Sequence, residues 1–158
     1  SDDGTNQVMT SPDGITWTAR NSPNSYWLNV TYGNGLFVAV AELTSPRIMT
    51  SPDGITWTER TVPVDRSFYG LAYGDGLFVG TNSNSVAEII ISTNGVNWST
   101  ATGVAQGLAL MTYGNGKFVF GGGSSVAKIH TADLLTYTTT GTFVSRPHAI
   151  ETAVSFPA

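Results

Sequence analysis

The feature that most constrains the fold of this 158-residue sequence is a seven-residue block that recurs at a nearly fixed spacing. The run SPDGITW occupies residues 11–17 and returns letter for letter at residues 51–57. Weaker copies, STNGVNW and TADLLTY, follow at residues 92–98 and 131–137, so the final aromatic residues are Trp17, Trp57, Trp98 and Tyr137. Self-similarity with a period of about forty residues indicates one supersecondary unit that is copied along the chain.

A second block keeps the same period and marks a hairpin. Tyr-Gly-Asn-Gly or Tyr-Gly-Asp-Gly stands at residues 32–35, 73–76 and 113–116. Glycine and asparagine adopt positive φ at low cost, which suits a tight turn. The Ser-Pro-Asp-Gly start of the first block is also typical of a turn. Within one period these turns separate four strand-like runs, at residues 27–32, 36–41, 47–50 and 55–60.

The pattern predicts an all-β fold, because eighteen glycines and seven prolines interrupt the chain and no segment has helical periodicity. Four antiparallel strands in each of several copies are typical of the blades of a β-propeller. A β-solenoid is the alternative, but its coils are usually shorter. We expect a single domain over residues 1–158, with whole blades at about residues 26–60, 68–101 and 107–140.

The two ends of the chain carry complementary parts of one further blade. Residues 1–20 contain its third and fourth strands, and residues 148–158 have the length and composition of its first strand. A ring of about four blades, closed by mixing terminal strands, would protect the strand edges. The alternative is a piece of a larger propeller, or one subunit of an oligomer whose ring closes between chains.

The composition of the chain limits the classes of partner that it can be expected to bind. The net charge is −4 with seven scattered Lys and Arg residues, which argues against nucleic acid. There is no cysteine, and no apolar run is long enough to cross a membrane. Neither the histidines nor the acidic residues have the spacing of a metal site, so we expect no metal and no cofactor. A polar surface rich in Thr and Asn favours an extracellular or virion location.

The SPDGITW blocks resemble the Asp-box, or bacterial neuraminidase repeat, whose pattern is Ser-x-Asp-x-Gly-x-x-Trp. The residue between aspartate and glycine is absent here, so the turn is one residue tighter. The resemblance implies turn-fixing roles for Asp13, Asp53, Asn94 and Asp133. It also implies that Trp17, Trp57, Trp98 and Tyr137 anchor the blades. The fourth copy departs from the pattern, because Leu134 replaces the glycine.

Together with the strands ahead of it, the block is similar to repeats of bacteriophage tail proteins, other virion proteins and bacterial surface proteins. The resemblance implies a structural or receptor-binding module without catalysis. A sugar-binding lectin is an alternative, and a sialidase-like glycoside hydrolase fragment is a third. The third needs an arginine cluster, but Arg20 and Arg60 occupy equivalent repeat positions and are more simply parts of the repeat.

The turns at one end of each predicted blade vary less from copy to copy than the loops at the other end. The glycine turns barely change from copy to copy, whereas the loops at residues 21–25, 61–67 and 82–87 differ throughout. Varied loops on a rigid scaffold favour recognition of a partner. The candidate binding residues near these loops are Tyr26, Trp27, Arg47, Arg66, Tyr69 and Arg146. Expected partners are a cell-surface protein or glycan, neighbouring virion subunits or further copies. Alternatively, Trp27 and Tyr69 only pack strands between blades.

Overall fold

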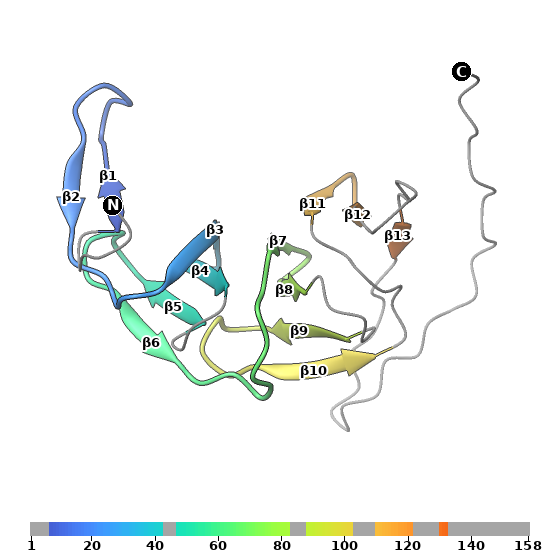
Figure 1. Cartoon of the computed structure of the whole chain (residues 1–158). Coiled ribbons are helices and arrows are strands. Elements are labelled where there is room, and N and C mark those ends of the chain that lie inside the picture. The colour runs from blue at the N-terminus through green and yellow to red at the C-terminus, as the bar shows by residue number, and fades with distance from the viewer. Residues whose placement is uncertain (1–6, 43–46, 83–87, 103–109, 122–129, 133–158) are drawn as a thin grey trace, which may run out of the picture.

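The structure is a computed structural model that describes residues 7–42, 47–82, 88–102, 110–121 and 130–132. These residues form thirteen strands in four antiparallel sheets, and none of them lies in a helix (Figure 1). The all-β fold expected from the sequence is therefore confirmed. Among these residues there is also no helix long and apolar enough to cross a bilayer.

The sheets follow one another in chain order, and each is a simple meander. The N-terminal hairpin pairs β1 (Val8–Thr10) with β2 (Thr18–Arg20). The first sheet contains β3 (Tyr26–Gly33), β4 (Leu36–Glu42), β5 (Ile48–Ser51) and β6 (Thr58–Arg60). The second sheet contains β7 (Gly70–Gly74), β8 (Leu77–Thr81), β9 (Glu88–Ser92) and β10 (Ser99–Thr102). The third sheet contains β11 (Leu110–Gly114), β12 (Lys117–Gly121) and β13 (His130–Ala132).

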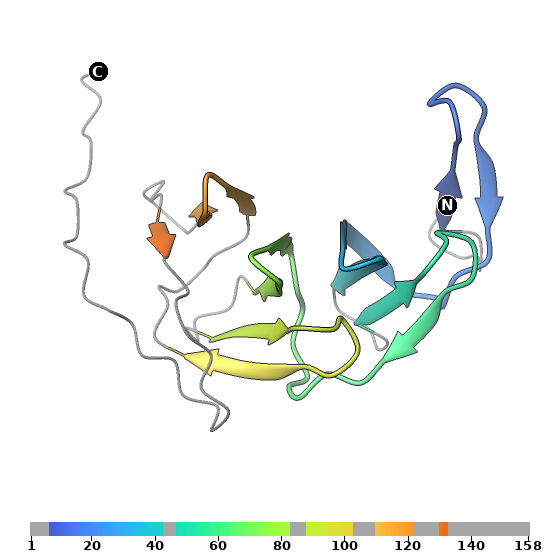
Figure 2. The same ribbon diagram turned by 180° about the vertical axis from the view of Figure 1, so that it is seen from behind.

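The first sheet spans residues 26–60 and the second spans residues 70–102. One strand is shorter than expected, because β6 begins at Thr58 and the residues before it belong to a turn. The four sheets follow an arc in which β7 lies beside both β3 and β11 (Figures 1 and 2). The described strands do not close a ring, and residues 148–158 lie outside the described part of the chain. Ring closure therefore stays a prediction.

The glycine turns between the first two strands of each sheet are two-residue turns. Asn34 and Gly35 have φ of 49° and 74°, and the same pair of positive values returns at Asp75–Gly76 and Asn115–Gly116. Positive φ at both central residues is the type I′ geometry, whose twist matches that of the flanking strands. The glycine that precedes each turn therefore belongs to the strand.

The core lies between neighbouring sheets. Val38, Val40 and Ile48 of the first sheet form one cluster with Leu71 and Phe78 of the second. A second cluster joins Val79 and Ile91 of the second sheet to Phe118 of the third. Both faces of β8 are buried along its whole length, from Leu77 to Thr81. Each sheet is thus stabilised by the sheets beside it.

Candidate functional site

The Ser-Pro-Asp-Gly turns are fixed by a repeated set of hydrogen bonds. Asp53 Oδ1 accepts from the backbone N–H groups of Ile55 at 2.8 Å and Thr56 at 2.9 Å. The Ser51 hydroxyl donates to the same oxygen at 2.9 Å and accepts from the N–H of Gly54 at 2.8 Å. Because the side chain takes up the amides that follow it, the next strand starts only at Thr58.

The same bonds occur in the other described copies. Asp13 Oδ1 accepts from Ile15 at 2.8 Å and Thr16 at 2.7 Å. In the third copy the amide oxygen of Asn94 accepts two backbone N–H groups at 2.9 Å each. The turn therefore needs an oxygen acceptor and not a negative charge. Asp133 lies outside the described residues.

Hydrogen bonding keeps the two turn carboxyl groups ionised. The Thr16 amide, followed by the Ile15 amide and the Ser11 hydroxyl, lowers the pKa of Asp13 to about 2. The pKa of Asp53 is lowered by the equivalent donors, the Thr56 amide first. A carboxylate with a lowered pKa is a poor general acid near neutral pH. These residues are therefore suited to holding turns.

The aromatic residues that end each block differ in burial. Trp98 is 8% exposed and lies in the cluster between the first and second sheets, with Nε1 donating to Gly95 O at 3.0 Å. Trp57 makes the same bond to Gly54 O but is only partly buried. Trp17, in the N-terminal hairpin, is 56% exposed. The burial of the tryptophan thus increases from Trp17 to Trp57 to Trp98. Tyr137 lies outside the described residues.

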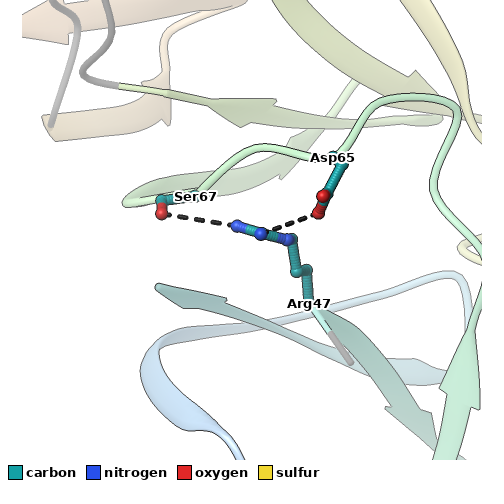
Figure 3. A network of polar contacts seen from close by, with 3 residues as sticks. All are labelled: Arg47, Asp65 and Ser67. Carbon is teal, nitrogen blue, oxygen red and sulfur yellow. Dashed lines mark hydrogen bonds and ion pairs between the residues drawn. The ribbon is translucent and has the colours of Figure 1, made fainter. Parts of the chain in front are cut away.

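The candidate binding residues were expected at the opposite edge, and Arg47 there is engaged within the protein (Figure 3). Its side chain is 10% exposed, and Nη2 lies 2.7 Å from Asp65 Oδ1. Nη1 donates to Ser67 Oγ at 3.4 Å. Asp65 and Ser67 belong to the connection between β6 and β7, so Arg47 fastens this connection to the first sheet.

Tyr69 joins the same junction. Its hydroxyl donates to Glu42 Oε1 at 2.7 Å, and its carbonyl accepts from Asn29 Nδ2 at 3.3 Å. In the register of β3 and β4, Tyr26 lies opposite Glu42 and Trp27 lies opposite Ala41. Four of the six candidates thus gather where the first sheet meets the second. We call Tyr26, Trp27, Glu42, Arg47, Ser67 and Tyr69 the rim junction.

The exposure of the candidates decides what they can contact. Tyr26 is 47% exposed, whereas Trp27 is partly buried and its indole Nε1 donates to Pro23 O at 2.8 Å. Arg66 is partly buried and lies in the connection before β7. Arg146 lies outside the described residues. The rim junction therefore presents the exposed Tyr26 beside a set of internal polar contacts, and Arg66 lies in the adjoining connection.

An open cavity of about 430 Å³ lies between the first and second sheets, and the sequence did not indicate it. Its lining combines charged, amide and apolar side chains: Glu59, Arg60, Thr61, Val62, Pro63, Val96, Asn97 and Trp98. Arg60 is partly committed, because its Nε donates to Thr50 Oγ1 at 2.8 Å. Arg20 makes the equivalent bond to Thr10. Such a lining is suited to a polar ligand that accepts and donates hydrogen bonds.

The contact that the sequence analysis missed involves the glycine before each hairpin turn. A Cβ placed on Gly33 would lie 2.0 Å from Cγ of Tyr73, and one on Gly74 would lie 2.1 Å from Cγ of Tyr113. The tyrosine ring of each following sheet therefore rests directly on a glycine backbone. The sequence did contain a signal for this contact, because a two-residue Asn-Gly turn does not require the glycine that precedes it in each copy.

Within the part of the chain that the structure describes, no three His, Cys, Asp or Glu side chains are grouped so that they could hold a metal ion.

Comparison with known proteins gives similarity in fold alone. No protein-family model matches the chain, and no curated protein matches it. Among solved structures, the computationally designed Ika8 protein is similar with a TM-score of 0.52 and 13% identity. That match covers 72% of this chain and 35% of Ika8, so the chain spans about a third of Ika8. The computationally designed Ika4 protein is similar with a TM-score of 0.51 and 12% identity, over 72% of this chain and 71% of Ika4.

Proposed function

We propose that the chain is a non-catalytic β-propeller module of a virion or cell surface, and that its varied rim binds a protein or glycan. The propeller is supported by meander sheets that repeat with the sequence period. It is also supported by the position of β7 beside both β3 and β11, along the inner side of the arc.

The main support for the proposal is that the turns at one end of the sheets are the same in each copy, whereas the connections at the other end differ. In a meander, the turn after the first strand and the turn after the third lie at the same end of the sheet. At that end the turns have the same dihedral angles and hydrogen bonds in every described copy. At the other end, the connection over residues 61–69 has its own sequence and contacts. A rigid frame with one variable edge is how binding loops are usually presented.

The rim junction gives this edge a defined position. The Arg47–Asp65 ion pair and the Tyr69–Glu42 hydrogen bond hold the connection between β6 and β7 against the first sheet. Tyr26 is exposed and Arg66 is partly buried in the connection between β6 and β7, and aromatic and arginine side chains contribute strongly to protein interfaces. We therefore place the binding surface around the junction of the first and second sheets.

A lectin is the second candidate, and the 430 Å³ cavity favours it. Glu59, Arg60 and Asn97 give that cavity the donors and acceptors that a sugar hydroxyl requires. The indole of Trp98 is 8% exposed, so it offers little surface for stacking against a sugar ring. The cavity thus supports a sugar contact made mainly by hydrogen bonds.

Binding to arrays of glycans and of purified cell-surface ectodomains tests the proposal. We expect the labelled chain to bind members of one array, and Arg66→Ala to weaken that binding at least about tenfold. The matched control is Thr93→Ala, an exposed change in the constant turn of the second sheet, which should leave binding intact. Glycan binding that is lost in Asn97→Ala but kept in Arg66→Ala would favour the lectin. No binding to either array, or equal loss in Thr93→Ala, would contradict the proposal.

A further inference from the structure

The two ends of the array carry the two halves of a contact that is complete inside it. Inside, Tyr73 covers Gly33 and Tyr113 covers Gly74. Tyr32 occupies the equivalent position in the first sheet, and it is 57% exposed. At the other end, a Cβ on Gly114 would meet nothing within 4 Å among the described residues. Among the described residues, one end thus has a tyrosine without a glycine, and the other has a glycine without a tyrosine.

At the N-terminal end of the array, the exposed surface extends beyond Tyr32 along β3. On one face of β3, Val30 and Tyr32 are exposed by 56% and 57%, and Leu28 at the neighbouring bulge is 49% exposed. The equivalent of Val30 in the second sheet is Leu71, which is 4% exposed and packs in the cluster with the first sheet. In the third sheet, Met111 and Tyr113 pack against the cluster of the second. A preceding sheet therefore covers this face in both later copies.

The opposite face is open at the far end. On β11, Leu110 is 69% exposed, and Thr112 and Gly114 are also exposed. On β7, the corresponding face carries Ala72, which is 6% exposed, and the buried Gly74. A following sheet covers this face in the second copy, because Tyr113 rests on Gly74. The exposed face of β3 and the exposed face of β11 are thus equivalent to surfaces that pack against each other at two junctions within the chain, between the first and second sheets and between the second and third sheets.

We propose that a second copy of this chain supplies the missing neighbour, with Tyr32 of one copy resting on Gly114 of the other. Such a contact joins unlike surfaces head to tail, which gives a ring where the rotation closes and a filament where it does not. The proposal rests on the repeated Tyr–Gly contact and is independent of receptor or glycan binding.

A second copy fits better than a later segment of the same chain. One period after Tyr113 and Gly114 the sequence has Ala153 and Val154. Alanine has no ring to cover Gly114. Valine would place a branched side chain where the internal contacts leave only about 2 Å for a Cβ. Residues 153 and 154 therefore do not reproduce the Tyr–Gly pair, whereas another copy of the chain supplies both residues.

The N-terminal hairpin completes the geometry of the contact. Its SPDGITW block marks β1 and β2 as the equivalents of β5 and β6. It lies next to the first sheet, since Cγ2 of Thr10 is 3.5 Å from the Cβ position of Gly54. The described residues include no first and second strands for this hairpin. The β11 and β12 strands of a second copy are such a pair, so they form a composite sheet in the order β11–β12–β1–β2.

The composite sheet requires an exchange at the edge of β12, where β13 pairs within the chain. In the sequence after β13, Leu134 stands where the intact blocks have glycine. The N-terminal hairpin instead carries a complete turn, with Asp13 bonded to two amides and Gly14 at φ 74°. The N-terminal hairpin of one copy is therefore the better formed partner for β12 of the other copy and takes the place of β13.

Sedimentation velocity over a range of concentrations tests the proposal. We expect the parent chain to exceed the 16.7 kDa of one copy as its concentration rises. Gly114→Ala adds a methyl group that meets no described atom within its own chain but would collide with Tyr32 of a second copy. It should weaken association at least about tenfold while the melting curve of the single chain is kept.

Mixing two variants shows whether the contact is head to tail. Tyr32→Ala retains a free Gly114, and Gly114→Ala retains a free Tyr32. We expect each alone to stay at the mass of one copy and their mixture to form pairs, while the control Thr93→Ala associates like the parent. A parent that stays at 16.7 kDa at every concentration would overturn the proposal. So would a Gly114→Ala variant that associates as well as the parent, or a mixture that does not associate.

Discussion

The smallest unit that links one copy to the next is a tyrosine ring resting on a glycine backbone. The ring takes the space that a Cβ would need, so glycine is required at Gly33 and Gly74 by packing and not by φ. Each tyrosine also lies against a phenylalanine of its own sheet, with ring centroids 4.5 Å apart for Tyr73 and Phe78. The tyrosine is thus held by its own sheet while it covers the glycine of the preceding one.

Replacing Gly74 tests this contact. Gly74→Ala should lower the free energy of unfolding by about 1–3 kcal/mol, because its Cβ would lie 2.1 Å from Tyr113 Cγ. Gly114→Ala is the matched control and should be close to neutral, since its Cβ meets no described atom. Urea denaturation at a concentration where the chain sediments as single copies measures both. Equal effects at the two positions would contradict the contact.

The turn carboxyl groups give a second prediction at this scale. The folded-state pKa of Asp53 lies below its ordinary value of about 4, so the stabilisation is present above that pH and is lost as the pH falls through the folded pKa. Asp53→Asn should retain the turn, because Asn94 makes the same bonds without charge. Melting temperatures between about pH 4 and pH 2 should fall less for this variant than for the parent. The converse variant, Asn94→Asp, should add acid sensitivity. Parallel profiles for all three proteins would refute this account.

At the level of elements, the burial of the tryptophan that ends each block depends on the sheet before it. Trp98 is buried against the first sheet, Trp57 has only the two-stranded N-terminal hairpin before it, and Trp17 has no described sheet before it. Burial follows the same order, from Trp98 at 8% to Trp17 at 56% exposed.

Alanine substitutions should therefore have graded costs. Trp98→Ala should destabilise by about 3–5 kcal/mol, as expected for a large buried aromatic residue. Trp57→Ala should cost less, and Trp17→Ala should stay within about 1 kcal/mol because its indole is exposed. Chemical denaturation of the three variants measures the series. Three equal losses would mean that the repeated blocks stabilise their sheets independently of their neighbours.

For the whole molecule, the arc has two unlike ends, and the Tyr–Gly contact decides what can cover them. If a second copy supplies Gly114 beneath Tyr32, deleting residues 148–158 should leave the concentration-dependent mass of the chain unchanged. If those residues instead supply the first strand of a blade shared with residues 1–20, the parent should be monomeric. The deletion would then expose the edge of β1 and cause aggregation. Sedimentation of the parent and the deletion variant side by side distinguishes the two.

The candidate site could be predicted only in part. The loops of the varied rim were located from their sequence differences, and Tyr26, Trp27, Arg47 and Tyr69 lie at one junction of two sheets. Sequence could not show that Arg47 is 90% covered and bonded to Asp65 and Ser67, because these contacts join the start of β5 to the distant connection between β6 and β7. The cavity at Asn97 was missed for the same reason, since its lining comes from two repeats.

The sequence by itself determined the all-β fold, the strand order and the turns. These depend on local rules, such as positive φ at Asn34–Gly35 and the side-chain acceptor of Asp53, and the short period repeats them. Only the tertiary structure decided which of the identical-looking copies are buried. Burial depends on whether a neighbouring sheet is present, so the equivalent residues Tyr32 and Tyr73, or Gly74 and Gly114, have different surroundings. A repeat sequence specifies the contact surface of each copy, and the position of the copy in the array determines whether that surface is covered.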